Sequence, residues 1–125
     1  MLRDTNAMAT VAVKDLPSAR RFYEDTLGFK PSATEGEEAV VYDSGNSKLL
    51  VYRSQFAGTN KATAVSFSVG DDIEQTVQSL KAKGVRFEKY DMPEMKHQGE
   101  LHIAGDMKAA WFKDPDGNIF GITNH

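Results

Sequence analysis

The chain has 125 residues, of which 40% are hydrophobic and 26% are charged, and its formal net charge is −3. This length suits one domain with a real core and is short for two ordinary ones. The small acidic excess and the lack of a clustered basic face argue against a nucleic-acid-binding protein, and no apolar run is long enough to span a membrane. We expect a soluble, cytoplasmic protein, because the amino terminus lacks the layout of a secretory signal and there is no cysteine.

The first half of the chain predicts one β-α-β-β-β module over about residues 7–53. Alternation of side-chain character begins at Met8 and predicts a strand. Asp15 is an acidic cap before a proline in the first turn, so a helix is expected from about Leu16 to Leu27, with Gly28 as its stop. Three strands should follow, at Phe29–Ser32, Ala39–Asp43 and Lys48–Tyr52.

A connector at residues 54–61 leads to a second module, over about residues 62–124. An alternating strand from Ala64 is followed by Asp72 and Gln75, which have the spacing of a capping box, and by a second helix that stops at Gly84. Strands are then expected at Phe87–Tyr90, Ala109–Lys113 and Ile119–Thr123. The two halves are in register, since Met8 and Ala64 have the same separation as Gly28 and Gly84.

Two stretches complete the predicted organisation. The segment Asp91–Asp106 does not fit the repeat and is expected to be a long loop. Near the carboxyl terminus, Pro115, Asp116 and Gly117 predict a tight turn between two strands. The predicted fold class is therefore α+β, a single domain in which two tandem β-α-β-β-β modules form a concave mixed sheet with the helices outside.

Three segments resemble the vicinal oxygen chelate superfamily, which includes glyoxalase I, extradiol dioxygenases, fosfomycin-resistance enzymes and bleomycin-resistance proteins. Their order and spacing carry the resemblance, which covers essentially the whole chain. It implies paired modules around a cleft, commonly in a homodimer. The segments are KDLPSARRFYEDTLGF, VGDDIEQTVQSLKAKGVRF and FKDPDGNIFGI.

The resemblance also implies where a divalent metal would be held, because enzymes of this family use His, Glu or Gln side chains on the concave strand faces. The matching positions are Met8, Ala64, either Leu50 or Val51, and Gly121. A thioether is a poor ligand for hard or borderline metals, and the other side chains offer no donor. We therefore expect that the family's metal is absent and that the protein uses no cofactor.

The remaining metal-like group is His97, Glu100 and His102, with Asp106 nearby. We expect these residues to lie in a solvated loop, and a metal or substrate role is the alternative. Nucleophilic catalysis finds little support, because there is no cysteine and no Gly-x-Ser-x-Gly motif.

The expected function is metal-independent binding of an apolar or aromatic small molecule in the cleft of a homodimer. Trp111 can stack on such a ligand or pack in the core, and Tyr90, Met92, Met95 and Met107 can close over it. A glyoxalase-like lyase or dioxygenase with a metal at a non-standard site is the alternative, and an interaction module whose own side chains fill the cleft is a third. The ligand-binding residues expected are Met8, Thr10, Phe56, Ser66, Ser68, Trp111 and Gly121.

Overall fold

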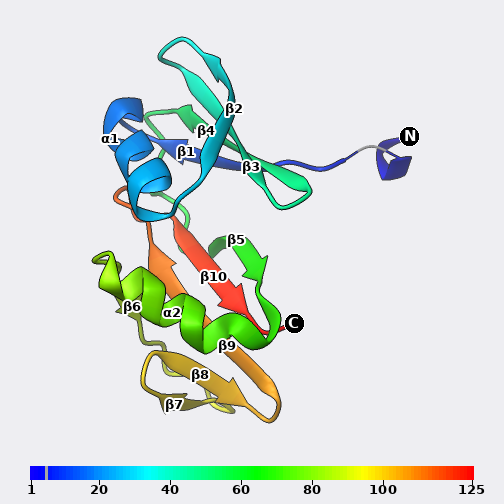
Figure 1. Ribbon diagram of the computed structural model, residues 1–125, viewed down its shortest axis with the longest axis vertical. Coiled ribbons are helices and arrows are strands. Elements are labelled where there is room, and N and C mark those ends of the chain that lie inside the picture. Colours follow the sequence, from blue (N-terminus) through cyan, green and yellow to red (C-terminus); the bar gives the residue numbers. More distant parts are fainter. Residues whose placement is uncertain (5) are drawn as a thin grey trace. The chain divides into compact units, whose positions relative to one another are not determined.

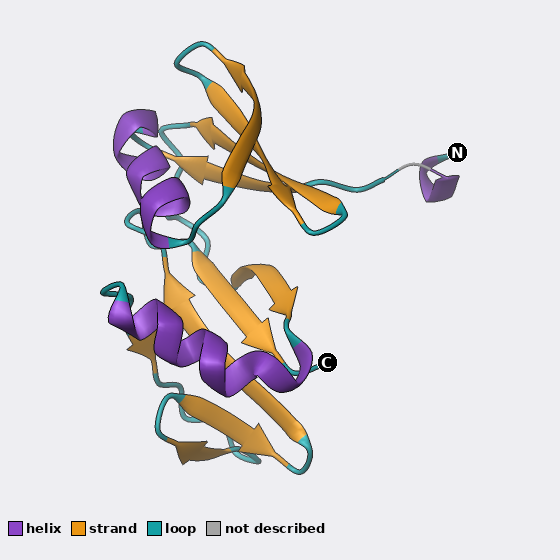
Figure 2. Ribbon diagram, in the orientation of Figure 1, coloured by secondary structure: helices purple, strands orange, loops and turns teal. Residues whose placement is uncertain are grey.

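The computed structural model describes residues 1–4 and 6–125, which form two compact units. The first unit comprises Met1–Asn60 and Pro115–Asn118, and the second comprises Lys61–Asp114 and Ile119–His125. Each unit has a mixed sheet with a helix packed on it (Figures 1 and 2). The predicted α+β class with tandem modules is confirmed, and its strands belong to two sheets, one in each unit.

The first sheet has the strand order β1-β4-β3-β2 (Figure 1). β1 pairs in parallel with β4 because a helical crossover separates it from the rest, whereas β2, β3 and β4 are joined as antiparallel hairpins. Gly45, at the β3–β4 turn, has the positive φ expected of a hairpin glycine. The strands span Ala9–Val13 (β1), Lys30–Glu35 (β2), Ala39–Ser44 (β3) and Ser47–Arg53 (β4).

The helix of the first unit begins as predicted and continues differently. α1 spans Leu16–Arg20, and its cap is confirmed, because the Ser18 backbone N–H donates to the Asp15 carboxylate over 3.0 Å. The prediction of a regular α-helix as far as Leu27 is wrong, because Arg21–Thr26 is a π-helix. Apolar spacing does not distinguish this wider turn from a regular one.

The π-helix brings two neighbouring side chains onto the same buried tyrosine. Tyr23 stacks on Tyr42 with ring centroids 5.9 Å apart, and the Tyr42 hydroxyl donates to the Glu24 carboxylate over 2.9 Å. Arg20 forms an ion pair with Glu24 and lowers the pKa of that carboxyl. Burial, and then Glu24, raise the pKa of Tyr42 well above its usual range. This cluster joins the helix to β3 at the edge of the core.

The second sheet has the strand order β5-β10-β9-β8-β7, and β6 also pairs with β9 (Figure 1). β5 is parallel to β10, as β1 is to β4 in the first unit. α2 (Ile73–Ala82) covers one face, and Gly84 follows it with a positive φ, as predicted. The strands span Thr63–Ser68 (β5), Phe87–Glu88 (β6), Lys96–Gln98 (β7), Leu101–Ala104 (β8), Met107–Lys113 (β9) and Ile119–Thr123 (β10).

Two predictions about the second unit are wrong. The segment Asp91–Asp106 is not one long loop, because β7 and β8 form a hairpin within it that extends the sheet beyond β9. The capping box is also not formed: a 3-10 turn at Gly70–Asp72 leads into α2, so Asp72 has φ −83° and ψ 9° instead of the extended conformation, and its side chain makes no cap hydrogen bond.

The turn Pro115–Asn118 belongs to the first unit and is tied to it by side chains. The Asp116 carboxylate accepts from the backbone N–H of Lys14 over 3.2 Å, and the Asn118 amide donates to the Ala12 carbonyl over 2.8 Å. Gly58 is required nearby, because a Cβ there would stand 2.0 Å from the Asp116 carbonyl oxygen. Asp116 is therefore a turn residue, as the sequence predicts.

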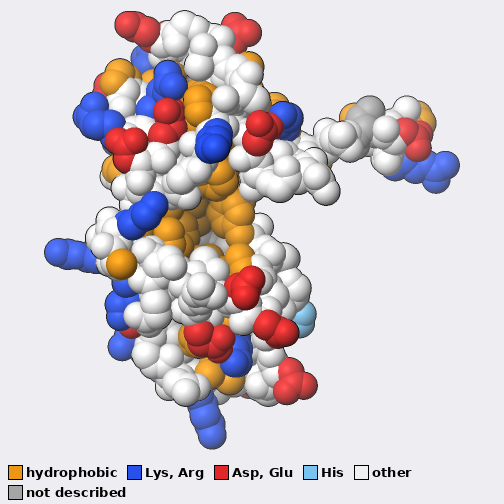
Figure 3. Space-filling model, in the orientation of Figure 1, with side chains coloured by type: hydrophobic (Ala, Val, Ile, Leu, Met, Phe, Trp, Pro, Cys, Tyr) orange, Lys and Arg blue, Asp and Glu red, His pale blue; other side chains and the backbone are white. Residues whose placement is uncertain are grey.

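The two cores are apolar, and the exposed surface is charged. In the first unit the buried side chains include Val11, Val13, Tyr23, Val40, Tyr42, Leu49 and Val51. In the second they include Ile73, Val77, Phe112, Phe120 and Ile122. On the face drawn in Figure 3, acidic and basic side chains are interspersed over each unit. Among the described residues, no helix has the length and apolar character that a membrane span requires.

Candidate functional site

The face of the second sheet turned away from α2 carries most of the predicted site, and we call it the helix-free face. Its first row runs across four strands: Gly121 pairs with Ser66 of β5 and with Trp111 of β9, and Trp111 pairs with Glu88 of β6. Residues paired across neighbouring strands share a face, so these four side-chain positions lie together. The alternation in the sequence predicts this grouping of Ser66, Gly121 and Trp111.

A second row lies two residues away from the first on β5, β10 and β9, and it continues onto β8 and β7. It contains, in order across the sheet, Ser68, Thr123, Ala109, His102 and His97. His102 is therefore a sheet residue, and it is fully buried. The prediction of a solvated loop is wrong for His102, whereas His97 on the edge strand β7 is exposed. The signal for β8 in the sequence is the alternating run Leu101–Ala104 between two glycines.

The indole of Trp111 lies against Gly121. A Cβ at residue 121 would stand 3.1 Å from the Trp111 Nε1 and 3.4 Å from its Cδ1, closer than a carbon atom fits without movement of the ring. The hydroxyl oxygen of Ser66 would be 3.4 Å from the same point. A Cβ at position 121 would therefore require the indole to shift by a few tenths of an ångström.

Trp111 belongs to a cluster of aromatic rings that meet edge to face. Its ring centroid is 4.8 Å from that of His102 and 5.6 Å from that of Tyr90, and the His97 and His102 rings are 4.7 Å apart. The Tyr90 backbone N–H donates to His102 Nε2 over 2.9 Å, and the Tyr90 carbonyl accepts from His97 Nε2 over 3.0 Å. These contacts fix the orientation of both imidazoles around Tyr90.

The environment of His102 favours its neutral form. Because Nε2 accepts a hydrogen bond, the proton of the neutral ring is on Nδ1. Burial, followed by the nearby His97, lowers the pKa of His102. Within residues 1–4 and 6–125, neither His102 Nδ1 nor the Tyr90 hydroxyl has a hydrogen-bond partner, and burial also raises the pKa of Tyr90.

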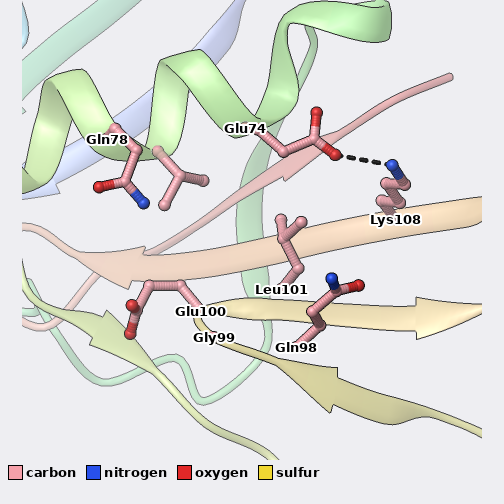
Figure 4. A pocket seen from close by; sticks show the side chains of 8 residues that line it. Glu74, Gln78, Gln98, Gly99, Glu100, Leu101 and Lys108 are labelled. Atoms are coloured by element: carbon pink, nitrogen blue, oxygen red, sulfur yellow. Dashed lines mark hydrogen bonds and ion pairs between the residues drawn. The ribbon is translucent and has the colours of Figure 1, made fainter.

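Glu100 is separated from this cluster. Its carboxylate pairs with Lys81 over 2.7 Å and lines a pocket of about 200 Å³ beside α2 (Figure 4). Glu74 and Lys108 form a second ion pair, of 2.6 Å, in the same pocket. In the part of the chain that the structure describes, no three His, Asp or Glu side chains are grouped to hold a metal. The alternative metal site at His97, Glu100 and His102 is therefore not assembled.

A pocket of about 440 Å³ lies beside the Trp111 ring. Apolar and aromatic side chains dominate its lining, and Lys61 and Asp91 contribute one charge of each sign. An adjoining group, including Met95 and His97, lines a second pocket of about 320 Å³. The lining of the larger pocket is Lys61, Ala62, Thr63, Tyr90, Asp91, Met92, Trp111 and Ile119. Of the predicted closing residues, Tyr90, Met92 and Met95 line one or both pockets.

The other predicted binding residues belong to the first unit. Met8 and Phe56 are large exposed side chains, 41% and 70% accessible, and the Thr10 hydroxyl donates to the Met8 carbonyl over 3.1 Å. The β1–β4 register pairs Thr10 with Leu50 and buries Val51 on the opposite face. Leu50 is therefore the residue that shares a face with Thr10, which resolves the alternative left open by the sequence.

Comparisons with known proteins agree with this fold. A model of the Glyoxalase/Bleomycin resistance protein/Dioxygenase superfamily matches residues 6–122. An integron cassette protein from the mobile metagenome of the Halifax Harbour sewage outfall has a TM-score of 0.71 at 20% identity, with 97% of this chain and 98% of that chain covered. A comparison with curated proteins gave no match.

Two further solved structures are enzymes or resistance proteins by their titles. The lactoylglutathione lyase from Agrobacterium tumefaciens has a TM-score of 0.71 at 15% identity, with 95% of this chain and 92% of that chain covered. The fosfomycin resistance protein FosX from Mesorhizobium loti has a TM-score of 0.69 at 13% identity, with 100% and 94% covered. At these identities the likeness shows a shared fold.

Proposed function

Because the chain belongs to the Glyoxalase/Bleomycin resistance protein/Dioxygenase superfamily, we propose that it binds a small aromatic or apolar molecule, and that it does so without a metal. The observation that carries this proposal is the Trp111 indole, which lies over Gly121 and lines a pocket with Tyr90, Met92 and Ile119. A pocket with apolar walls and a few polar groups is the usual form of a small-molecule site.

The chemistry of the side chains supports the metal-free part of the proposal. Gly121 has no donor atom, and a side chain there would be in tight contact with the indole, 3.1 Å from its Nε1 to the Cβ. Met8 offers only a thioether, and Leu50 and Ala64 offer no ligand atom. These residues do not fit the divalent metal that the family resemblance implies, so no step of the proposed function depends on one.

The proposal is tested with the single tryptophan of the chain. A thermal-shift screen of aromatic metabolites and antibiotics finds candidate ligands, and each is then titrated while Trp111 fluorescence is recorded. We expect binding to change the emission, because the ligand contacts the indole. Trp111→Ala should weaken binding by about tenfold or more, since a stacked aromatic pair and its buried area are lost.

The control is Leu2→Ala, which removes an exposed apolar side chain far along the sequence from the helix-free face. It should leave the affinity unchanged. A Trp111→Ala variant that binds an identified ligand as tightly as the parent protein would contradict the proposed site. Met8, Thr10 and Phe56 remain predictions from the sequence, and alanine variants of each enter the same titration.

A homodimer is part of the proposal, because the resemblance implies one. Sedimentation equilibrium measures the mass in solution, and a monomer at micromolar concentration would contradict this part alone.

A further inference from the structure

We infer that the ligand carries a carbonyl or carboxylate oxygen, which accepts hydrogen bonds from the indole N–H of Trp111 and the hydroxyl of Ser66. The inference rests on the proposed function and specifies the chemical class of the ligand at the same site. The ligand is thus an aromatic or apolar body with one oxygen acceptor, held over Gly121.

The first step is the convergence of two polar atoms on one glycine. Trp111 Nε1 and Ser66 Oγ reach toward Gly121 from the strands on its two sides, β9 and β5. They lie 3.1 and 3.4 Å from the point where a Cβ of residue 121 would be. Since glycine places no side chain between them, a ligand atom above Gly121 has access to both.

The second step is that the Trp111 indole N–H and the Ser66 hydroxyl are both available to form hydrogen bonds with a ligand. Among residues 1–4 and 6–125, the structure gives neither the Trp111 Nε1 nor the Ser66 hydroxyl a hydrogen-bond partner, although Trp111 makes ring contacts with Tyr90 and His102. An indole N–H donates and cannot accept, whereas a serine hydroxyl can rotate to donate to the same atom. The matching ligand atom is therefore an acceptor.

The third step concerns the charges around Gly121, which decide whether the ligand atom there is an oxygen acceptor or a cation. An N–H donor repels a cation at this position, and the nearest carboxylate in the row, that of Glu88, already has Lys113 as a partner at 3.6 Å. Lys61 and Asp91 at the pocket contribute opposite charges. The row thus provides donors without an unmatched negative charge, which favours a neutral carbonyl or an anionic carboxylate.

The fourth step places the body of the ligand. Ile119 lines the 440 Å³ pocket and stands two residues before Gly121 on β10, so the two positions share a face. Trp111 contributes to both places, because it lines the pocket and its Nε1 and Cδ1 lie next to Gly121. A planar ligand in the pocket can therefore direct one oxygen toward the two donors.

The experiment uses a matched pair of probes, acetophenone and ethylbenzene, which differ in the carbonyl oxygen, with benzoate as the anionic probe. The single tryptophan gives one indole N–H signal in a ¹H–¹⁵N spectrum. We expect acetophenone and benzoate to move this signal downfield and to bind about tenfold more tightly than ethylbenzene, because each of two hydrogen bonds contributes several-fold.

Three variants assign the preference to its donors. Ser66→Ala should weaken the binding of acetophenone about fivefold and leave that of ethylbenzene unchanged. The control Ser79→Ala, at an exposed serine on α2, should affect the binding of neither probe. Trp111→Phe keeps an aromatic ring without the N–H and should remove most of the preference. Gly121→Ala should weaken the oxygen-bearing probes by filling the space between the donors.

The outcomes distinguish this inference from the proposed function. If acetophenone and ethylbenzene bind equally well, or if the indole N–H signal does not respond to a bound carbonyl, the inference is overturned while small-molecule binding stands. If no aromatic probe binds at millimolar concentration, the proposed function fails and the inference fails with it. A preference for the oxygen-bearing probe that is reduced about fivefold or more in both Ser66→Ala and Trp111→Phe supports the inference.

Discussion

Gly121 and Trp111 depend on each other at the scale of single residues. A Cβ at residue 121 would stand 3.1 Å from the indole Nε1, so any other residue there would require the ring to shift by a few tenths of an ångström. Gly121 offers no side-chain donor, whereas the indole of Trp111 presents an N–H that can donate a hydrogen bond.

His102 gives the protein a predicted sensitivity to acid. Its folded-state pKa is lowered by burial and by His97, so it lies below the ordinary value near 6.5 that applies in the unfolded chain. As the pH falls, the imidazole of residue 102 is therefore protonated at a higher pH in the unfolded chain than in the folded protein. The contribution of neutral His102 to the free energy of unfolding is fully present above pH 6.5, and it is lost as the pH falls through the folded-state pKa. We expect the urea midpoint to fall between pH 7 and pH 5.

The measurement compares urea unfolding at several pH values in three proteins. His102→Gln should show a flatter dependence over this range than the parent chain. His125→Gln, at the exposed carboxyl terminus, is the control and should retain the parent's dependence. An unchanged slope in His102→Gln would contradict the assignment.

Alternation along strands predicts which residues share a face, and so the sequence predicts Ser66, Gly121 and Trp111 together. It does not predict that the Trp111 ring leans onto Gly121, because that depends on a rotamer and on the pairing of three strands. The burial of His102 is also not predicted, since β8 lies outside the internal repeat. In the first unit, the choice between Leu50 and Val51 requires the β1–β4 register.

Local chemistry decides how each element begins and ends. Gly28 and Gly84 both have positive φ after their helices, which the sequence predicts from the stop signal of each half. The π-helix at Arg21–Thr26 and the 3-10 turn at Gly70–Asp72 are not predicted, because their residues have ordinary helical spacing. The β7–β8 hairpin is missed because it is an insertion relative to the first module.

The two helix starts provide a matched test at the scale of elements. Asp15 accepts a hydrogen bond from the Ser18 N–H, whereas Asp72 makes no cap bond from its side chain. Asp15→Ala should therefore lower the melting temperature by about 3–5 °C, the usual effect of losing a cap in a domain of this size. Asp72→Ala should lower it by less than half as much. Calorimetry measures the melting temperatures of the two variants. Equal decreases in melting temperature would contradict the assignment of Asp15 as the cap.

At the scale of the whole molecule, the internal sequence repeat explains why the fold can be predicted from a single sequence. Two halves in register specify the same crossover twice, with β1 parallel to β4 and β5 parallel to β10. The order of elements is therefore predicted with its helices and its closing hairpin. Structures with 13–20% identity share this fold, and at that distance they identify neither a ligand nor a reaction.

The absence of suitable ligands at four positions predicts how the whole protein responds to metals. Met8, Leu50, Ala64 and Gly121, the positions at which the family resemblance implies ligands, carry no oxygen or imidazole donor. We therefore expect protein purified without chelator to contain far less than one equivalent of Mn, Fe, Ni or Zn by elemental analysis.

The proposed metal-free binding predicts that EDTA leaves both the melting temperature and the affinity for an aromatic ligand unchanged. A paired variant sharpens the test. Gly121→Glu should fail to create metal affinity, both alone and together with Trp111→Ala, because one added carboxylate is too few ligands to hold an ion. Near-stoichiometric metal in the parent protein, or melting that falls with EDTA and recovers with one added metal, would contradict this account and favour the lyase or dioxygenase alternative.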